Sequence, residues 1–156
     1  MTWTEKYRPK NLNEIRGQEE AVSKIRSFFK SFPDNKKALI LHGPPGIGKT
    51  TLAYALASEE SYEIFELNAS DFRNKEKIQE VLKPAIEQKS LTNKGKIILI
   101  DEVDGMSEGE AGGITALLNL IETTSWPIII TANDAWNRKM SSIRNKSDML
   151  KLKEID

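Results

Sequence analysis

Residues 43–50 read Gly43-Pro44-Pro45-Gly46-Ile47-Gly48-Lys49-Thr50 and match the pattern G-x-x-x-x-G-K-[ST]. An apolar run, Ala38 to Leu41, precedes this stretch, and a stripe of helical spacing over residues 52–57 follows it. The pattern between a buried strand and a helix predicts a loop whose backbone N–H groups surround a phosphate chain at the positive end of the helix dipole. A glycine-rich turn formed by chance is the alternative, and the flanking elements argue against it.

Two side chains at the end of this loop have the chemistry that a bound phosphate chain requires. We expect Lys49 to contact the β and γ phosphates of a nucleotide. Thr50 supplies a hydroxyl oxygen, which suits Mg²⁺ because this ion keeps several waters and shares its other ligands with the nucleotide. His42 is the only histidine, and a packed residue at a strand end is favoured over a catalytic one.

A second motif, residues 97–104, is an apolar strand that ends in the carboxylates of Asp101 and Glu102. Open α/β sheets bind their ligands at the carboxyl ends of the strands. We expect Asp101 to hold the Mg²⁺ shell and Glu102 to orient or deprotonate the attacking water, which favours hydrolysis over binding alone. A solvated acidic strand end is the alternative, and the phosphate loop about fifty residues upstream weakens it.

A third apolar strand, residues 128–130, leads to Asn133. We expect the Asn133 side chain to touch the γ-phosphate or its attacking water. Taken alone, an asparagine after a strand is most often a turn residue. Its place after the two earlier motifs supports the functional interpretation.

The remaining pattern predicts one α/β domain with a parallel five-stranded sheet flanked by helices. The chain has 156 residues, which suits one domain with a sizeable core. Helical spacing recurs at residues 114–121, and a polar helix capped by Ser70 or Asp71 is expected to run towards Gln88. The expected strands are 38–41, 64–67, 97–100, 128–130 and 149–155.

Composition narrows the classes of function. Twenty-three basic and twenty-three acidic residues give no net charge, so the overall balance does not indicate general attraction to nucleic acid or membranes. Cysteine is absent, which excludes disulfides, thiolate catalysis and cysteine zinc sites. The sequence has neither a secretory signal pattern nor a long apolar run, so we expect no membrane association and a cytoplasmic protein.

In this order along the chain, the three motifs resemble Walker A, Walker B and sensor 1 of the AAA+ class of P-loop ATPases. Within that class, Trp3 to Pro9, Ile15 to Glu19 and Glu66 to Asp71 are similar to clamp-loader subunits. The resemblance implies that residues 1–17 form an arm closing over the adenine and ribose, and that 18–156 form a RecA-like nucleotide-binding domain. It also implies that Asn68 restrains Glu102 until a partner engages, although a strand-end cap is an equal alternative.

The resemblance gives a full set of expected site residues, with ATP or ADP and Mg²⁺ as cofactors. The expected catalytic residues are Glu102, Lys49 and Asn133, and the expected metal ligands are Thr50 and Asp101. The expected ATP-binding residues are Gly43, Pro44, Pro45, Gly46, Ile47, Gly48, Lys49, Thr50, Thr51, Tyr7, Arg8, Pro9, Ile15, Arg16 and Gly17.

One departure from the clamp-loader pattern distinguishes two kinds of subunit. Small subunits carry Ser-Arg-Cys near the end of this domain, and its Arg is the finger offered to a neighbouring ATP site. The comparable stretch here is Arg144-Asn145-Lys146-Ser147, and lysine does not reproduce the planar fork of arginine. The sequence therefore looks like the large subunit of archaeal replication factor C, which receives a finger in trans and need not donate one.

The resemblance implies small clamp-loader subunits, the PCNA sliding clamp and primer-template DNA as partners, with ATP acting as a timed switch. In that family a lid with sensor 2 and a collar follow this domain, so we expect a core fragment with slow hydrolysis in isolation. Candidate contacts are residues 107–115 for DNA, where a mobile loop is favoured instead, and 78–86 for the clamp, where a core-facing stripe explains the spacing equally well. Another AAA+ motor such as a branch-migration helicase, or a nucleotide-binding assembly module without turnover, is the alternative function.

Overall fold

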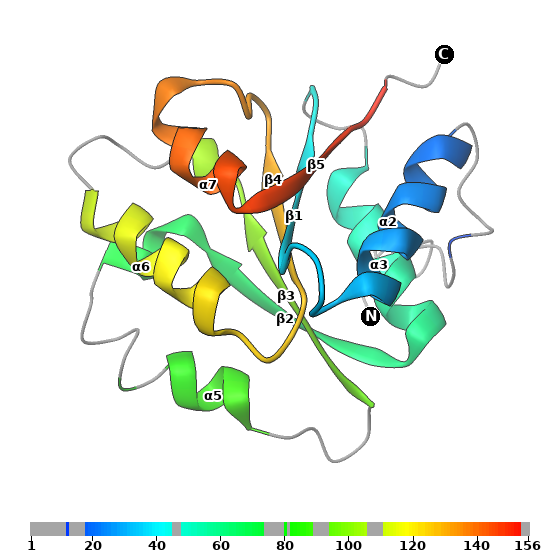
Figure 1. Ribbon diagram of the computed structural model, residues 1–156, viewed down its shortest axis with the longest axis horizontal. Coiled ribbons are helices and arrows are strands. Elements are labelled where there is room, and N and C mark those ends of the chain that lie inside the picture. Colours follow the sequence, from blue (N-terminus) through cyan, green and yellow to red (C-terminus); the bar gives the residue numbers. More distant parts are fainter. Residues whose placement is uncertain are drawn as a thin grey trace, which may run out of the picture.

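A sheet of five strands in the order β2-β3-β4-β1-β5 forms the centre of the fold (Figure 1). The computed structural model describes residues 12, 18–44, 48–73, 80, 82–88, 94–105 and 111–153. All neighbouring strands pair in parallel, which confirms the predicted α/β class and the five-stranded parallel sheet. The strands are β1 (Ala38–His42), β2 (Tyr62–Asn68), β3 (Gly95–Asp101), β4 (Ile128–Ala132) and β5 (Ser147–Lys151).

Helices cover both faces of this sheet, with α2 and α3 on one side and α5, α6 and α7 on the other (Figure 1). Among the described residues, none of the helices combines the length and apolar character needed to cross a bilayer. The α-helices are α2 (Glu19–Ser31), α3 (Lys49–Glu60), α5 (Lys83–Glu87), α6 (Ala111–Thr123) and α7 (Ser141–Asn145), and the 3₁₀ segments are η2 (Ala69–Arg73), η4 (Val103–Gly105) and η6 (Arg138–Met140).

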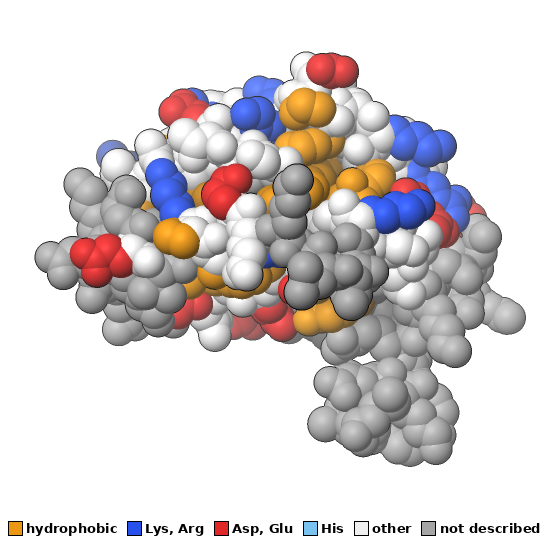
Figure 2. All heavy atoms as spheres, turned by 90° about the horizontal axis from the view of Figure 1, so that it is seen from below, with side chains coloured by type: hydrophobic (Ala, Val, Ile, Leu, Met, Phe, Trp, Pro, Cys, Tyr) orange, Lys and Arg blue, Asp and Glu red, His pale blue; other side chains and the backbone are white. Residues whose placement is uncertain are grey.

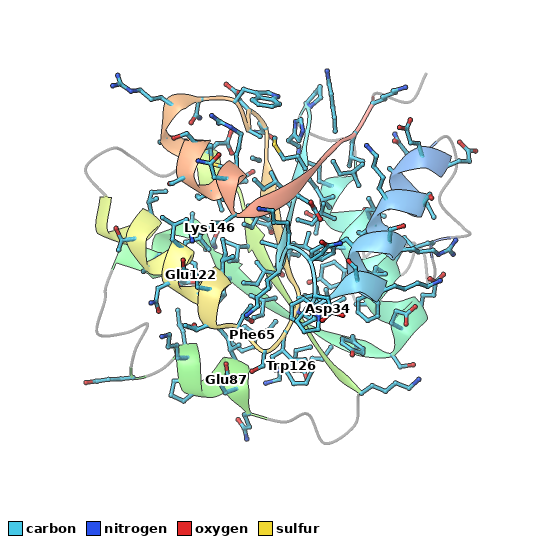
Figure 3. The ribbon with its side chains drawn as sticks, in the orientation of Figure 1. Asp34, Phe65, Glu87, Glu122, Trp126 and Lys146 are labelled. Carbon is cyan, nitrogen blue, oxygen red and sulfur yellow. The ribbon has the colours of Figure 1, made fainter. Side chains whose placement is uncertain are left out.

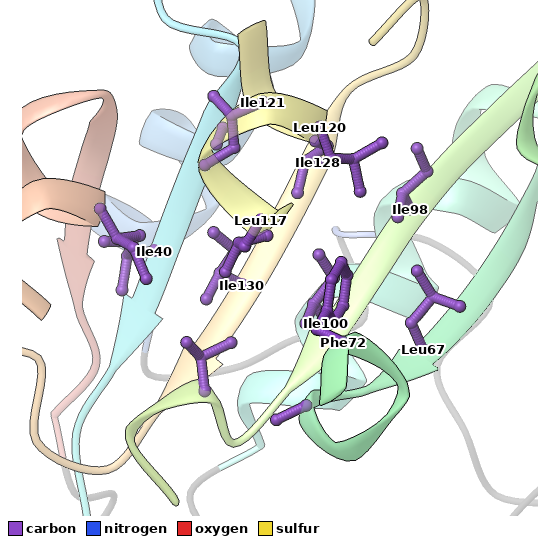
Figure 4. Packing of buried hydrophobic residues seen from close by; sticks show 14 of the residues in the cluster. Ile40, Leu67, Phe72, Ile98, Ile100, Leu117, Leu120, Ile121, Ile128 and Ile130 are labelled. Carbon is purple, nitrogen blue, oxygen red and sulfur yellow. The ribbon is translucent and has the colours of Figure 1, made fainter. Parts of the chain in front are cut away.

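The central strands β1, β3 and β4 are mostly apolar, as expected for strands whose two faces are both buried. Successive residues alternate between the two faces, so Ile128 and Ile130 pack under α6 while Ile129 packs under α2 and α3. Figure 4 shows the α6 side, where Leu117, Leu120 and Ile121 lie over these strands. The continuous Ile and Leu runs that indicate buried strands in the sequence therefore have their physical cause in this two-sided packing.

Besides small shifts in the ends of the other strands, the observed elements differ from the expected ones at β5, at η2 and at α2. Strand β5 begins at Ser147 rather than at residue 149 and ends at Lys151, because its first residues pair with β1 at the sheet edge despite their polarity. Ser70 and Asp71, the expected helix caps, lie inside η2, where Asp71 accepts a hydrogen bond from the Asn68 N–H; residues 74–79 of the expected helix lie outside the described residues. Helix α2 is not among the helices that the sequence predicts above, although its buried residues follow helical spacing.

The carboxylate of Glu59 joins α3 to α2 and to Leu12, which precedes α2 in the chain. Arg26 donates to it from Nη2 over 2.7 Å and from Nε over 3.1 Å, and the Leu12 N–H donates over 3.3 Å. The hydrogen bonds from Arg26, the charge of Arg26 and the Leu12 amide hold the pKa of Glu59 below its ordinary value, against the opposing effect of burial. Leu12 itself is buried among residues of α2 and α3.

We expect the Glu59→Gln variant to lower the free energy of unfolding at pH 7 by about 1 kcal/mol, the upper end for a partly exposed ion pair. A carboxylate whose pKa is depressed on folding stabilises the fold above its unfolded-state pKa, and this stabilisation is lost as pH falls through the folded-state pKa. Urea unfolding of both proteins at pH 7 and at progressively more acidic pH should give a shrinking difference. Glu60→Gln, which removes a neighbouring carboxylate without breaking the pair, is the control. A difference independent of pH would contradict this account.

Candidate nucleotide-binding site

A cleft of about 570 Å³ lies where β3 and β4 end and α3 begins. This is the carboxyl edge of a parallel sheet, the edge at which such folds bind ligands. Residues from all three sequence motifs therefore meet in one place. The cleft is lined by Gly48, Lys49, Thr50, Thr51, Asn68, Asp101, Glu102, Thr131 and Asn133.

The predicted phosphate loop joins β1 to α3. Gly43 has a φ of 147° and Gly48 a φ of 83°, conformations that residues with a side chain rarely adopt. Gly48 is the N-cap of α3, so the unpaired N–H groups of the first helical turn lie at the cleft. The Gly43 N–H donates to the Ala132 carbonyl over 3.3 Å, which fixes the start of the loop to the end of β4. The helix terminus and its dipole make this position suitable for an anion.

Lys49 is buried, with 8% of its surface exposed, and its ammonium group is held by three acceptors. Nζ donates to the Gly43 carbonyl over 2.9 Å, to the Pro44 carbonyl over 3.1 Å and to Asn133 Oδ1 over 3.0 Å. Burial lowers the pKa of Lys49, and the nearby carboxylates of Asp104, Glu102 and Asp101 act in the opposite direction. The cation is thus already placed between the loop and the end of β4.

Asp101 and Thr50 bring two hard oxygen atoms together at the cleft. Thr50 Oγ1 lies 3.5 Å from Asp101 Oδ1, and both residues are partly buried. Hydroxyl and carboxylate oxygens are the ligands that Mg²⁺ prefers when it shares its shell with phosphates and water. The donor set of this chain therefore fits the expected magnesium ion.

Glu102 follows β3 with a φ of 54°, a left-handed conformation that is uncommon for a residue other than glycine. Its backbone N–H donates to Thr131 Oγ1 over 3.0 Å, and its side chain is exposed at the cleft. Strained backbone of this kind is concentrated at functional sites. A carboxylate that borders the same cleft as Lys49 is suitably placed to act on a water there.

Asn133 directly follows β4, and the carboxylate of Asp104 fixes its backbone. Asp104 Oδ2 accepts hydrogen bonds from the N–H groups of Asn133, over 3.2 Å, and Asp134, over 3.0 Å. Asp104 belongs to the 3₁₀ turn that follows β3. The turn after the second motif therefore positions the residue of the third.

Thr131 and Asp104 are site residues that the sequence analysis misses. Thr131 reads as an ordinary strand residue, since threonine favours β structure. Its only signal is that one hydroxyl residue follows the run of three isoleucines, two positions before Asn133. Asp104 follows the acidic pair by two residues, and sequence alone does not show that it reaches another strand.

His42 is buried at the end of β1 and is not among the residues that line the cleft. Its ring meets the ring of Trp136 edge to face, with 6.3 Å between the centroids. Burial is the main cause that lowers the pKa of His42, and the charge of Lys151 adds to it. This environment is that of the packed residue which the sequence favours.

The two candidates for an arginine finger are both engaged within the chain. Arg144 Nη1 donates to the carbonyls of Ala135, over 2.6 Å, and Asn137, over 2.9 Å, and the guanidinium lies 5.2 Å from the centroid of the Trp136 ring. Lys146 forms an ion pair with Glu122 of α6 (Figure 3). Arg144 therefore holds the turn before η6 instead of standing free at the surface.

Several expected site residues lie outside the described residues. Among the described residues, Gly43 and Pro44 begin the loop, and Asn68 borders the cleft at the end of β2, paired in register with Asp101. The predicted DNA and clamp segments, residues 107–115 and 78–86, are described only in part. The site residues outside the described ranges are Tyr7, Arg8, Pro9, Ile15, Arg16, Gly17, Pro45, Gly46 and Ile47.

Comparison with known proteins gives a family match and close relatives. Residues 39–151 match the ATPase family associated with various cellular activities, AAA. The replication factor C large subunit of Thermofilum pendens is 47% identical over 161 residues, covering 99% of this chain and 39% of that protein. The subunits of the same name from Nanoarchaeum equitans and Sulfolobus acidocaldarius are 47% and 46% identical, covering 96% and 99% of this chain. The chain spans 36% and 37% of the length of these two relatives.

Proposed function

Because the chain belongs to the AAA family of ATPases, we propose that it is the ATP-binding and ATP-hydrolysing core of a clamp-loader large subunit. The observation that carries this proposal is the convergence of three motifs on one cleft. Lys49, Asp101 and Asn133 come from different parts of the sequence and border the same space. The names of the relatives support the assignment to replication factor C.

The residues of the three motifs have distinct parts in the proposed reaction. Lys49 and the N–H groups at the start of α3 would bind the phosphates, and Thr50 and Asp101 would hold the magnesium ion. When bound, the ion would neutralise part of the negative charge of the phosphates. Glu102 orients or deprotonates the attacking water, and Asn133 contacts the γ-phosphate or that water.

We assign the adenine and ribose to the arm formed by residues 1–17, beside the domain of residues 18–156. The burial of Leu12 against α2 and α3, and its hydrogen bond to Glu59, support a docked arm. Tyr7, Arg8 and Pro9, with Ile15 to Gly17, are the proposed pocket residues.

The proposed site receives its arginine finger from a neighbouring subunit. The internal contacts of Arg144 and Lys146 favour this arrangement, since neither side chain is presented as a planar fork to a neighbour. A finger supplied in trans contributes roughly 10³- to 10⁵-fold to turnover in related phosphoryl transfer reactions. Hydrolysis by this chain alone is therefore expected to be slow.

The proposed partners are clamp-loader small subunits, the PCNA sliding clamp and primer-template DNA. Figure 2 shows one face on which Lys and Arg side chains are interspersed with Asp and Glu. Such a face does not provide one broad basic surface, so DNA contact is expected to be local and to depend on the assembled subunits. The proposal includes a cytoplasmic location, either in the cytosol or associated with the nucleoid.

ATP hydrolysis in the presence of partners tests the proposal. The chain is measured alone and with small subunits, clamp and primed DNA, and the measurement is repeated with a full-length large subunit. Turnover should rise only when the partners are added. Demonstrated assembly of the full-length subunit without stimulation would contradict the clamp-loader function and favour a binding module, whereas unwinding of DNA without a clamp would favour a helicase.

A further inference from the structure

Thr131 makes two hydrogen bonds that join the two carboxylate residues of the second motif. Its hydroxyl donates to Asp101 Oδ1 over 2.9 Å and accepts from the Glu102 N–H over 3.0 Å. The side chain is 2% exposed, so water does not compete freely for these bonds. A threonine hydroxyl has one proton to give and lone pairs to receive, and this geometry uses both functions.

Strand order explains why Thr131 lies there. Strand β4 is hydrogen-bonded to β3 on one side and to β1 on the other, with Ile130 beside Ile100. One residue further along each strand, Thr131 of β4 therefore lies beside Asp101 of β3. A single polar residue in an otherwise apolar strand end is thus placed against the last residue of β3.

We infer that Thr131 is a positioning residue for ATP hydrolysis, with one hydroxyl that orients both the Asp101 carboxylate and the Glu102 backbone. This inference rests on the proposed ATPase function. Thr131 and Thr50 both approach Asp101 through Oδ1, so Oδ2 is used by neither contact. The hydrogen bond from the Glu102 N–H holds Glu102 in its left-handed backbone conformation. It therefore fixes the direction in which the Glu102 side chain points from the backbone.

Two functions of the site should therefore fail together when the hydroxyl is removed. In the proposed reaction, Asp101 would hold the magnesium ion, whereas Glu102 would orient or deprotonate the attacking water. Outer partners that orient metal ligands typically change metal affinity or activity by about 10- to 100-fold when they are lost. If Thr131 only packed against its neighbours, removal of its hydroxyl would not change the magnesium dependence of ATP binding and the hydrolysis rate together.

The test compares Thr131→Val, which keeps the shape without the hydroxyl, with Thr131→Ser, which keeps the hydroxyl. Binding of a fluorescent ATP analogue is measured with Mg²⁺ and with excess chelator, and phosphate release is measured in single-turnover reactions. In the valine variant, the gain in affinity given by Mg²⁺ should fall at least about threefold and the hydrolysis rate about tenfold. The serine variant should stay within about twofold of the unmodified chain, and affinity without Mg²⁺ should be unchanged in both.

Thr124→Val is the matched control. Thr124 is also buried, and its hydroxyl donates to the Trp126 carbonyl over 2.7 Å and accepts from the Trp126 N–H over 3.0 Å, away from the cleft. This variant loses an equivalent pair of bonds and should keep the magnesium dependence and the hydrolysis rate. The inference is overturned if Thr131→Val matches the unmodified chain, if Thr131→Ser is equally defective, or if Thr124→Val has the same defects. Failure of the unmodified chain to bind ATP would instead overturn the proposed function on which the inference depends.

Discussion

The Lys49→Ala variant is expected to bind ATP at least about 100-fold more weakly than the unmodified chain, a loss of about 2.7 kcal/mol. Lys49 is the buried cation of the cleft, and Asn133 Oδ1 and two loop carbonyls hold its ammonium group in place. A charge that is already positioned binds phosphate at a lower ordering cost than a mobile one. Alanine removes this charge where burial makes its interaction with phosphate strong.

Fluorescence titration with an ATP analogue measures this change, and Lys96→Ala provides a matched control. Lys96 is a second buried lysine, with 5% of its surface exposed. Its ammonium group lies outside the cleft and donates to the Ala85 carbonyl at a distance of 2.7 Å. Its replacement should lower the stability of the fold and leave the affinity for ATP within about threefold. Retention of ATP affinity by the folded Lys49→Ala variant would exclude the phosphate-binding role.

The Glu102→Gln variant is expected to keep its affinity for ATP within about threefold and to lose hydrolysis by at least about 100-fold, as for loss of a general base. Glutamine has nearly the same size and fits the same left-handed backbone position, held by the bond to Thr131. It does not accept a proton from water at neutral pH. The change therefore separates binding from the chemical step.

Binding titration and phosphate release on the same protein samples check this separation. Glu122→Gln removes an exposed carboxylate that pairs with Lys146 outside the cleft, and it should leave both quantities unchanged. Equal hydrolysis rates for the Glu102→Gln variant and the unmodified chain would show that Glu102 does not act on the attacking water.

The phosphate loop and the Asp101-Glu102 strand end were predictable because each depends on local sequence. Gly43 and Gly48 adopt backbone that glycine allows, and the apolar run before Asp101 marks a strand buried on both faces. Such features require only neighbouring residues. The sequence therefore places Asp101 at the end of a buried strand and Lys49 at the start of a helix, where the structure has them.

Contacts between strands were not predictable in the same way. The pairing of Thr131 with Asp101, and of Asp104 with the amides after β4, depends on β3 and β4 being neighbours. Alternating elements in the sequence indicate a parallel sheet without giving its strand order. The start of β5 was misplaced for a related reason, because its first residues are polar and are held by pairing with β1 at the edge.

Arg144 illustrates a third limit of sequence reasoning. Its position in the chain suggests a finger or a surface charge, and its chemistry fits both. The carbonyls of Ala135 and Asn137 and the Trp136 ring engage it only because the chain turns between β4 and η6. The direction of a long cationic side chain is set by tertiary contacts that no local pattern contains.

Single-turnover hydrolysis of γ-labelled ATP, with protein in excess over nucleotide and Mg²⁺ present, tests the central claim most directly. Excess protein removes the effects of weak affinity and slow product release. We predict that the unmodified chain releases labelled phosphate at a slow but measurable rate, and that Glu102→Gln binds the same amount of ATP without this release. Stoichiometric binding with no more phosphate release than the Glu102→Gln variant would contradict a hydrolytic site and leave a nucleotide-binding module.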